Sequence, residues 1–227
     1  MKAEARSLVR KPIVTGDLIH LSEGTVIQLS GIGPRRAGAA AKNLLEHGAT
    51  ALLSWGSAGG LVPTLSPGSL VLPILVIGAD QSSYSTDPTW HGRLLNRLKG
   101  SLDLHQGSLT ESVTVLKNST EKRILFERTG AMAVDMESGA VAKVAQEAQV
   151  PFMVVRAVAD STDTTIPESS LKAVDEFGRL SCLKLIQGLV EYPGEFLALV
   201  RIARNYRAAQ RTLSVVARLT GYNLLVP

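Results

Sequence analysis

Sulfur, aromatic side chains and long apolar runs are all scarce in this sequence. Cys182 is the single cysteine among 227 residues, which excludes an intramolecular disulfide and favours a reducing compartment such as the cytoplasm. No run of about 18 apolar residues occurs, and the opening residues, MKAEARSLVRK, hold no apolar core of a signal peptide. We therefore expect a protein that neither crosses a membrane nor is secreted through a signal peptide.

Metal-ligand patterns and an evenly spread basic charge are also missing. The four histidines lack the spacing of metal ligands, so no metal is predicted. The net charge of +4 comes from residues 193–227, which hold five arginines and one acid, whereas residues 1–192 carry 19 basic and 19 acidic residues. A neutral body argues against a nucleic-acid partner.

What is present indicates one globular domain. Hydrophobic residues make up 45% of the chain, enough for a folded protein of this length to enclose a pocket beside its core. One boundary is visible, at Tyr192-Pro193-Gly194. It separates a domain at 1–192 from a basic C-terminal helix and tail at 193–227.

Strand and helix patterns alternate along the chain. Short β-branched or leucine-rich runs predict strands at Thr25–Leu29, Ala51–Trp55, Ser69–Ile77, Ser112–Leu116 and Pro151–Val158. Proline starts, glycine stops and i, i+3, i+4 apolar spacing predict helices at Pro34–His47, Pro88–Lys99 and Met136–Ala148. The expected fold class is α/β, a single-domain three-layer αβα arrangement with a mixed central sheet flanked by helices. In such sheets ligands bind beyond the carboxyl ends of the strands.

Two glycine-rich segments follow predicted strands. The first, Gly31-Ile32-Gly33-Pro34-Arg35-Arg36, has an arginine where a dinucleotide fingerprint has its third glycine, and no acid follows about twenty residues on, so that site is excluded. The second, Gly56–Gly60, contains Ser57 but lacks the lysine of a P-loop. For both segments a tight turn and a ligand-binding loop fit the spacing equally well.

Carboxylates stand at two further points. Asp135 and Glu137 open a predicted helix, and on the residues alone a helix cap explains them better than a substrate role. Asp160 ends the most apolar predicted strand, where desolvation raises the pKa of a carboxyl and suits it to donate a proton near neutrality. A cap or an ion pair with Arg156 explains Asp160 equally well.

Taken in order, these segments resemble one family, the superfamily of purine nucleoside phosphorylases and 5′-methylthioadenosine/S-adenosylhomocysteine nucleosidases. The resemblance runs from about Thr25 to Gly188. The matching pieces are SGIG at 30–33, GSAGGLVPTLSPGSLV at 56–71, AVDMES at 133–138 and PFMVVRAVADSTD at 151–163. Finer features, YSTD at 84–87 and the arginine-rich tail after PGE at 193–195, resemble the hopanoid-associated phosphorylase branch, which is associated with removing adenine from adenosylhopane.

The resemblance implies cleavage of the bond between adenine and ribose in a purine nucleoside. Asp160 would protonate the departing base on its five-membered ring, and Glu137 would hold the ribose hydroxyls. Val113 to Leu116 would border the base. No cofactor is implied, although phosphate is a candidate co-substrate. The implied substrate-binding set is Glu137, Met136, Ser57, Ile32, Gly33, Val113, Val115 and Arg156.

Three departures from the family pattern matter. Ala159 replaces a serine that stands just before the acid, and no aromatic residue stands near Thr114 to stack on adenine. The family's first apolar strand is missing, although Glu4 aligns with the glutamate that follows it and activates water. Either the sequence begins late or the sheet lacks a strand, and Glu4 would then be unanchored.

The nucleophile stays open at this point. Ser54 stands where related phosphorylases place an arginine, which favours water. A tentative phosphate site at Gly33, Arg35 and Ser57 favours phosphorolysis. The alternatives are therefore a phosphorylase acting on a nucleoside such as adenosylhopane, a methylthioadenosine/adenosylhomocysteine nucleosidase, and a catalytically inactive nucleoside-binding protein.

The expected assembly is a homodimer, as is common among the nucleosidases, with contact near Tyr84 and Trp90. The tail predicts a long helix from Glu195 to about Leu219, with four arginines in a stripe about 60° wide and apolar residues on the roughly opposite face. Such a helix suits the cytoplasmic (inner) surface of a membrane. We therefore consider peripheral membrane association of a cytoplasmic protein as a candidate localisation. Packing of its apolar face against the domain is favoured slightly.

Overall fold

The computed structural model describes residues 2–9, 14, 16–22, 24–167, 187, 191–221 and 223–226. Its helices and strands follow in the order α1 (Lys2–Ala5), β1 (Leu18–Ser22), β2 (Thr25–Gln28), α2 (Pro34–Glu46), β3 (Leu52–Gly60), β4 (Leu70–Ile77), β5 (Ser83–Ser85), α3 (Pro88–Leu98), β6 (Leu104–Glu111), α4 (Ser119–Thr129), β7 (Ala133–Asp135), α5 (Ser138–Glu147), β8 (Phe152–Asp160), a short 3₁₀ helix (Pro193–Glu195) and α8 (Phe196–Thr220).

The central sheet is mixed and closes on itself. Its strand order is β5-β4-β6-β7-β3-β8, and β4 also pairs with β8. The pairs β3–β8, β4–β6 and β6–β7 are parallel, whereas β3–β7 and β4–β8 are antiparallel and short. β1 and β2 form a separate antiparallel hairpin. The expected α/β class with a mixed central sheet is confirmed.

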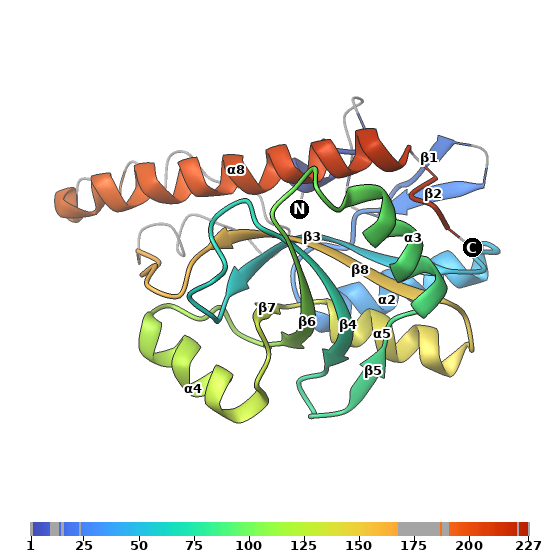
Figure 1. Ribbon diagram of the computed structural model, residues 1–227, viewed down its shortest axis with the longest axis horizontal. Coiled ribbons are helices and arrows are strands. Elements are labelled where there is room, and N and C mark those ends of the chain that lie inside the picture. The colour runs from blue at the N-terminus through green and yellow to red at the C-terminus, as the bar shows by residue number, and fades with distance from the viewer. Residues whose placement is uncertain are drawn as a thin grey trace.

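Helices cover the sheet on both sides, as Figure 1 shows, with α3 and α8 on one side and α2 and α5 on the other. The side chains of α3 and α8 pack with those of β8 in one apolar cluster, which includes Trp90, Met153 and Leu213. The α2 and α5 side forms a second cluster, which includes Ala41 and Ala142. Burial of these apolar side chains is the main term that favours the folded chain.

Most predicted helices begin and end close to the observed residues. Pro34 and Pro88 each occupy the first turn of a helix, and the Asp87 side chain accepts a hydrogen bond from the Trp90 N–H at 2.7 Å. The helix predicted to start at Met136 begins at Ser138. Asp135 nevertheless acts as its cap, because its Oδ1 accepts the N–H groups of Glu137 and Ser138.

One predicted strand is wrong. Residues 112–116 form no strand, and the strand lies just before them, as β6 at Leu104–Glu111. The β-branched residues Val113 and Val115 misled the prediction, because both are exposed on a connecting loop. The polar run in β6 is instead held by pairing on both sides, with β4 and with β7.

The predicted dimer contact at Tyr84 and Trp90 is also wrong for these side chains. Trp90 is 1% exposed, and its indole N–H donates to the Leu224 carbonyl oxygen at 2.8 Å, while Tyr84 is buried in the α2 and α5 cluster. Aromatic residues next to a turn suggested a surface, but both residues belong to the protein's own core.

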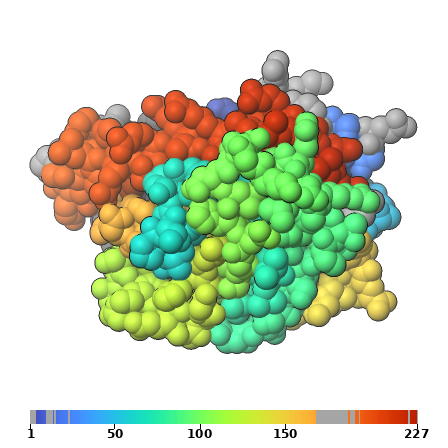
Figure 2. Space-filling view, in the orientation of Figure 1, coloured from blue at the N-terminus to red at the C-terminus, as the bar shows by residue number. Residues whose placement is uncertain are grey.

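The long C-terminal helix is present and packs against the body along its second half. Leu213 and Val216 are buried against α3 and the sheet, and the arginines of the predicted stripe are exposed. Figure 2 shows α8 crossing the molecule, with its amino-terminal part reaching past the other coloured elements. None of the described helices is both long and apolar enough to span a membrane.

Candidate active site

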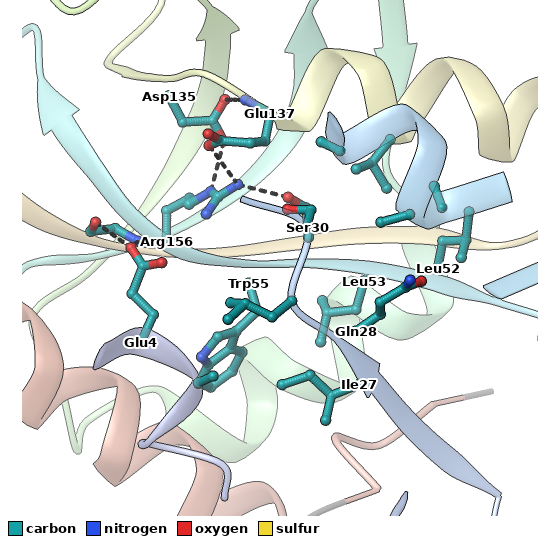
Figure 3. Close-up of a pocket in the computed structure, with 18 of the residues that line it drawn as sticks. Glu4, Ile27, Gln28, Ser30, Leu52, Leu53, Trp55, Asp135, Glu137 and Arg156 are labelled. Carbon is teal, nitrogen blue, oxygen red and sulfur yellow. Dashed lines mark hydrogen bonds and ion pairs between the residues drawn. The ribbon is translucent and has the colours of Figure 1, made fainter. Parts of the chain in front are cut away.

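A cavity of about 1030 Å³ brings together most of the residues singled out in the sequence. Its polar part is lined by Glu4, Ser57, Glu137, Arg156 and Asp160, which come from four separate segments of the chain. Its apolar part is lined by β2 and by the first half of β3. Figure 3 shows Glu4, Asp135, Glu137 and Arg156 near one another, and Ile27, Leu53 and Trp55 further along the cavity.

Glu4 is anchored, contrary to the expectation that it would be loose. Its Oε1 accepts the backbone N–H of Ser57 at 2.9 Å and the Ser57 hydroxyl at 2.5 Å, and the residue is buried. The short α1 helix therefore holds a carboxylate against the glycine-rich loop without a preceding strand. Two donors on one oxygen favour the ionised form, which is the form that a general base needs.

Gly56 explains how these charged groups approach the strand so closely. A Cβ atom at this position would lie 2.2 Å from the Arg156 Nη1 atom and 3.2 Å from the Glu4 carboxyl carbon. Since real Cβ atoms do not approach other atoms to that distance, a larger residue at position 56 would require the Arg156 guanidinium to shift. The segment is the second half of strand β3 rather than a turn or a loop, and a role in ligand binding stays a prediction.

Glu137 faces the cavity from the start of α5. Its Oε1 accepts the Gly33 N–H at 3.0 Å, and its Oε2 accepts the Met136 N–H at 3.3 Å. Gly33 adopts a φ of 96°, a conformation that L side chains rarely adopt, and this turns its N–H toward the carboxylate. Burial raises the pKa of Glu137, the nearby Asp135 charge raises it further, and Arg156 opposes both.

Arg156 orients these carboxylates. It is 3% exposed, and its Nε forms an ion pair with Asp135 at 2.7 Å. Its Nη2 donates to Ser54 at 2.7 Å and lies 3.9 Å from Glu137. Because this buried guanidinium is already paired with Asp135 and hydrogen-bonded to Ser54, it supports Glu137 from behind instead of binding a ligand itself. The ion pair that the sequence suggested with Asp160 is not the one that forms.

Asp160 ends β8 beside a group that the sequence did not identify. The Nζ of Lys122 contacts Asp160 Oδ2 directly and also donates to the Ser161 carbonyl oxygen at 2.6 Å. The Lys122 side chain is 1% exposed and that of Asp160 is 22% exposed. Burial raises the pKa of Asp160, as predicted, and the Lys122 ammonium opposes that shift.

The remaining predicted site residues divide into two groups. Ile32, Met136 and Val115 line the cavity. Val113 and Arg35 are exposed and do not line it, because the 112–116 loop turns Val113 outward and the first turn of α2 points Arg35 away. The tentative phosphate site is therefore not assembled, since the Gly33 N–H is also occupied by Glu137.

Lys122 had a signal in the sequence that pointed to its helix but not to its role. Asn118 and Glu121 form a reciprocal cap, in which the Glu121 N–H donates to Asn118 Oδ1 at 3.0 Å, and Gly130 ends the helix in a left-handed conformation. That pattern predicts α4. Nothing local distinguishes Lys122 from a solvated lysine, because its partner lies 38 residues away in the sequence.

Comparison with known proteins places these features in one family. Residues 9–192 match the family model described as the phosphorylase superfamily. A putative 5′-methylthioadenosine/S-adenosylhomocysteine nucleosidase from Francisella philomiragia is 18% identical with a TM-score of 0.70, over 97% of this chain and 95% of that one. A mutant Helicobacter pylori nucleosidase with 5′-methylthioadenosine in its active site is 17% identical with a TM-score of 0.66, over 96% and 95%.

A third solved structure carries a different name on the same fold. The futalosine hydrolase of Helicobacter pylori is 18% identical with a TM-score of 0.64, over 96% of this chain and 94% of that one. Identities this low establish the shared fold. What the cavity of the present chain does has to be argued from its own residues.

Proposed function

The chain belongs to the phosphorylase superfamily, and from that premise we propose that it hydrolyses the bond between an adenine-type base and the ribose of a nucleoside. The contact between Glu4 and Ser57 is the observation that supports water, and not phosphate, as the nucleophile. The N–H and hydroxyl of Ser57 are donors that an anion such as phosphate would need, and the Glu4 carboxylate already occupies both. A second anion at this place would meet like-charge repulsion.

The proposed mechanism uses three carboxylates in separate roles. Asp160 gives a proton to the five-membered ring of the base, so the bond to ribose breaks with its electron pair going to the base. Glu137, fixed by the Gly33 and Met136 N–H groups, accepts hydrogen bonds from ribose hydroxyls and stabilises the positive charge that develops on the sugar. Glu4 takes the proton from the attacking water.

For the substituent at the ribose 5′ position we propose a large apolar group, as in adenosylhopane. The cavity of about 1030 Å³ lies at the upper end of the range for small-molecule sites, which is more space than adenosine needs. Part of its wall is apolar, with Leu116, Ile166 and Ile202 among the lining residues. Methylthioadenosine and adenosylhomocysteine are the alternative substrates and would leave much of this space unfilled.

Release of adenine from 5′-methylthioadenosine, adenosylhomocysteine and adenosine with an apolar 5′ chain, measured with and without phosphate, tests this proposal. We expect phosphate-independent release, and a Glu4→Gln variant that keeps the Ser57 contacts but loses the base should be slower by about 10²-fold or more. Strict dependence on phosphate would replace hydrolysis with phosphorolysis. Tight binding of a nucleoside without release of adenine from any of the three nucleosides would support the remaining alternative, a catalytically inactive nucleoside-binding protein.

A further inference from the structure

Lys122 is an unusual residue for the inward face of a short helix. In α4 only Lys122 and Leu125 are buried, so the lysine occupies a position that an apolar side chain would normally fill. Lysine is almost never fully buried unless it is paired, because its ammonium group loses its hydration. Its placement therefore needs a reason beyond packing.

That reason lies in its two partners. The ammonium group contacts the Asp160 carboxylate and the Ser161 carbonyl oxygen, so it fixes both the acid and the loop that follows it. Lys122 and Asp160 both line the cavity, and Asp160 keeps 22% of its side chain accessible. The pair is thus closed toward α4 and open toward the substrate.

Among the described residues, two further charged groups lie near this pair. From the loop after β8, Asp163 is exposed and accepts a hydrogen bond from the Ser161 hydroxyl at 2.6 Å. From α8, the exposed Arg201 acts on Asp163. Neither contacts the Asp160 carboxylate in the described part of the chain, although the Lys122 charge also acts on Asp163, and Gly59 of the facing strand β3 has no side chain there. Lys122 is therefore the charge that controls Asp160.

We propose that Lys122 is a positioning residue that keeps Asp160 aimed at the base and resupplies the proton that Asp160 gives away. This inference rests on the proposed cleavage of a nucleoside. The pair carries one proton in the free protein. As the base departs, that proton moves from the Lys122 ammonium through the Asp160 carboxyl to the base, which leaves a neutral amine beside a carboxylate, and solvent then reprotonates the amine. The proton removed from water by Glu4 returns to solvent, so the reaction is balanced.

The proposal predicts how pH affects Lys122→Met. In the parent protein Lys122 supplies the proton that is delivered through Asp160, so kcat/KM does not depend on the pKa of the Asp160 carboxyl alone. With methionine, burial acts on Asp160 without opposition, and the proton is lost at the pKa of that single carboxyl. The alkaline limb of the profile should therefore move to lower pH, with kcat/KM falling about tenfold for each further pH unit.

Two further variants separate charge from shape. Lys122→Gln keeps a hydrogen-bond donor without a charge or an acidic proton, and it should move the alkaline limb as methionine does. Arg123→Gln removes a neighbouring cation of α4 that is exposed and paired with Glu127, and it should leave the profile unchanged. A uniform loss of rate at every pH in both Lys122 variants would show a purely structural role and overturn the proposal.

A second measurement does not need turnover. The ¹³C signal of the Asp160 carboxyl, assigned with Asp160→Asn, should titrate at higher pH in Lys122→Met than in the parent. The same midpoint in both proteins would overturn the inference even if the enzyme is active. Absence of base release from the parent would instead refute the proposed function, while this titration would still decide whether Lys122 controls Asp160.

Discussion

At the scale of single residues, the site depends on which carboxyl groups carry protons. Burial alone would raise the pKa of all three carboxyl groups, but hydrogen bonds from Ser57 and the charge of Arg156 help to lower the pKa of Glu4, whereas the pKa values of Glu137 and Asp160 are raised. Carboxyl groups thus differ in their tendency to hold a proton because their surroundings differ. This separation allows one carboxyl to act as a base and another as an acid in the same cavity.

Asp160→Asn should abolish base release, with a loss of about 10²- to 10⁴-fold in kcat, because the amide cannot serve as the acid. The fold should survive, since the shape of the side chain is kept. The Lys122 ammonium loses its counter-charge, however, so the melting temperature should fall. Circular dichroism and an adenine-release assay measure both effects. Activity within a few-fold of the parent would remove Asp160 from the mechanism.

Glu111 allows a prediction about stability away from the cavity. Burial is the main cause that raises its pKa, although its Oε1 accepts the Ala140 N–H at 2.9 Å. The folded protein then holds this proton more tightly than the unfolded chain does. The free energy of unfolding should therefore fall as pH rises from the ordinary glutamate value through the raised one.

Glu111→Gln removes this contribution while an amide oxygen can still accept the Ala140 N–H. Urea unfolding measured between about pH 4 and pH 8 should show a flatter dependence on pH than the parent shows. The exposed Glu127→Gln serves as the matched control and should follow the parent. A parallel curve for Glu111→Gln would mean that the carboxyl titrates alike in the folded and unfolded chains.

At the scale of elements, the first half of β3 has one unused edge. The Leu52 N–H is directed to the Pro151 carbonyl oxygen on the β8 side, so the N–H groups of Leu53 and Trp55 point the other way. In the described part of the chain no strand pairs with them there, because β7 reaches only Gly59 and Gly60. The cavity separates this edge from β2.

An apolar strand of about five residues added before Met1 should pair with this edge. Its ladder bonds and buried area are worth several kcal/mol, comparable with the whole margin of stability of a domain. We expect the extended protein to melt higher and to release base faster, and the present chain to be weakly active. An extension of equal length made of glycine and serine is the control. Equal turnover and melting temperature in all three proteins would show that this edge of β3 does not need a partner strand.

The elements also show what sequence alone can predict. Pro34, Pro88 and Asp87 act locally, so the starts of α2 and α3 could be predicted from neighbouring residues. β6 could not, because it is held by partners on both sides rather than by its own side chains. The same distinction applies to the site. Asp160 stands out at the end of an apolar strand, whereas the role of Lys122 exists only after folding.

At the scale of the whole molecule, the two halves of α8 differ. Its second half is part of the core, so deleting 195–227 would remove buried Leu213 and Val216 and unfold the protein. Its first half presents Phe196, Leu197 and Val200, of which Leu197 is 78% exposed. Exposed apolar side chains next to a stripe of arginines suit an anionic lipid surface.

Co-sedimentation with vesicles tests membrane contact without unfolding the protein. We expect the full chain to bind vesicles that contain anionic lipid at low salt, and binding to weaken as salt rises, since arginines supply the attraction. Replacing Leu197 and Val200 with serine should reduce binding without changing the melting temperature. A full chain that stays in the supernatant at low salt would show that α8 has a structural role only.

A homodimer remains a prediction, and its contact surface has to be one other than Tyr84 and Trp90. The exposed apolar residues at the start of α8 are the candidate surface. Light scattering across micromolar concentrations should give the mass of two chains. Replacing Leu197 and Val200 with serine also tests whether this surface forms the dimer, binds the membrane, or does both. Light scattering measures loss of the dimer, and co-sedimentation measures loss of vesicle binding.

The hairpin of β1 and β2 borders the cavity, yet it shares no ladder with the central sheet. Its hold on the body comes from side chains such as Ile19, Leu21 and Ile27, which pack beside α1 and the end of α8. Such contacts can separate without breaking backbone hydrogen bonds, so this corner opens at a lower free energy than the closed ring of strands. We therefore expect the hairpin side to be the route by which a bulky nucleoside of the proposed kind reaches the cavity, while Asp160, at the end of β8, stays fixed on the closed ring of strands.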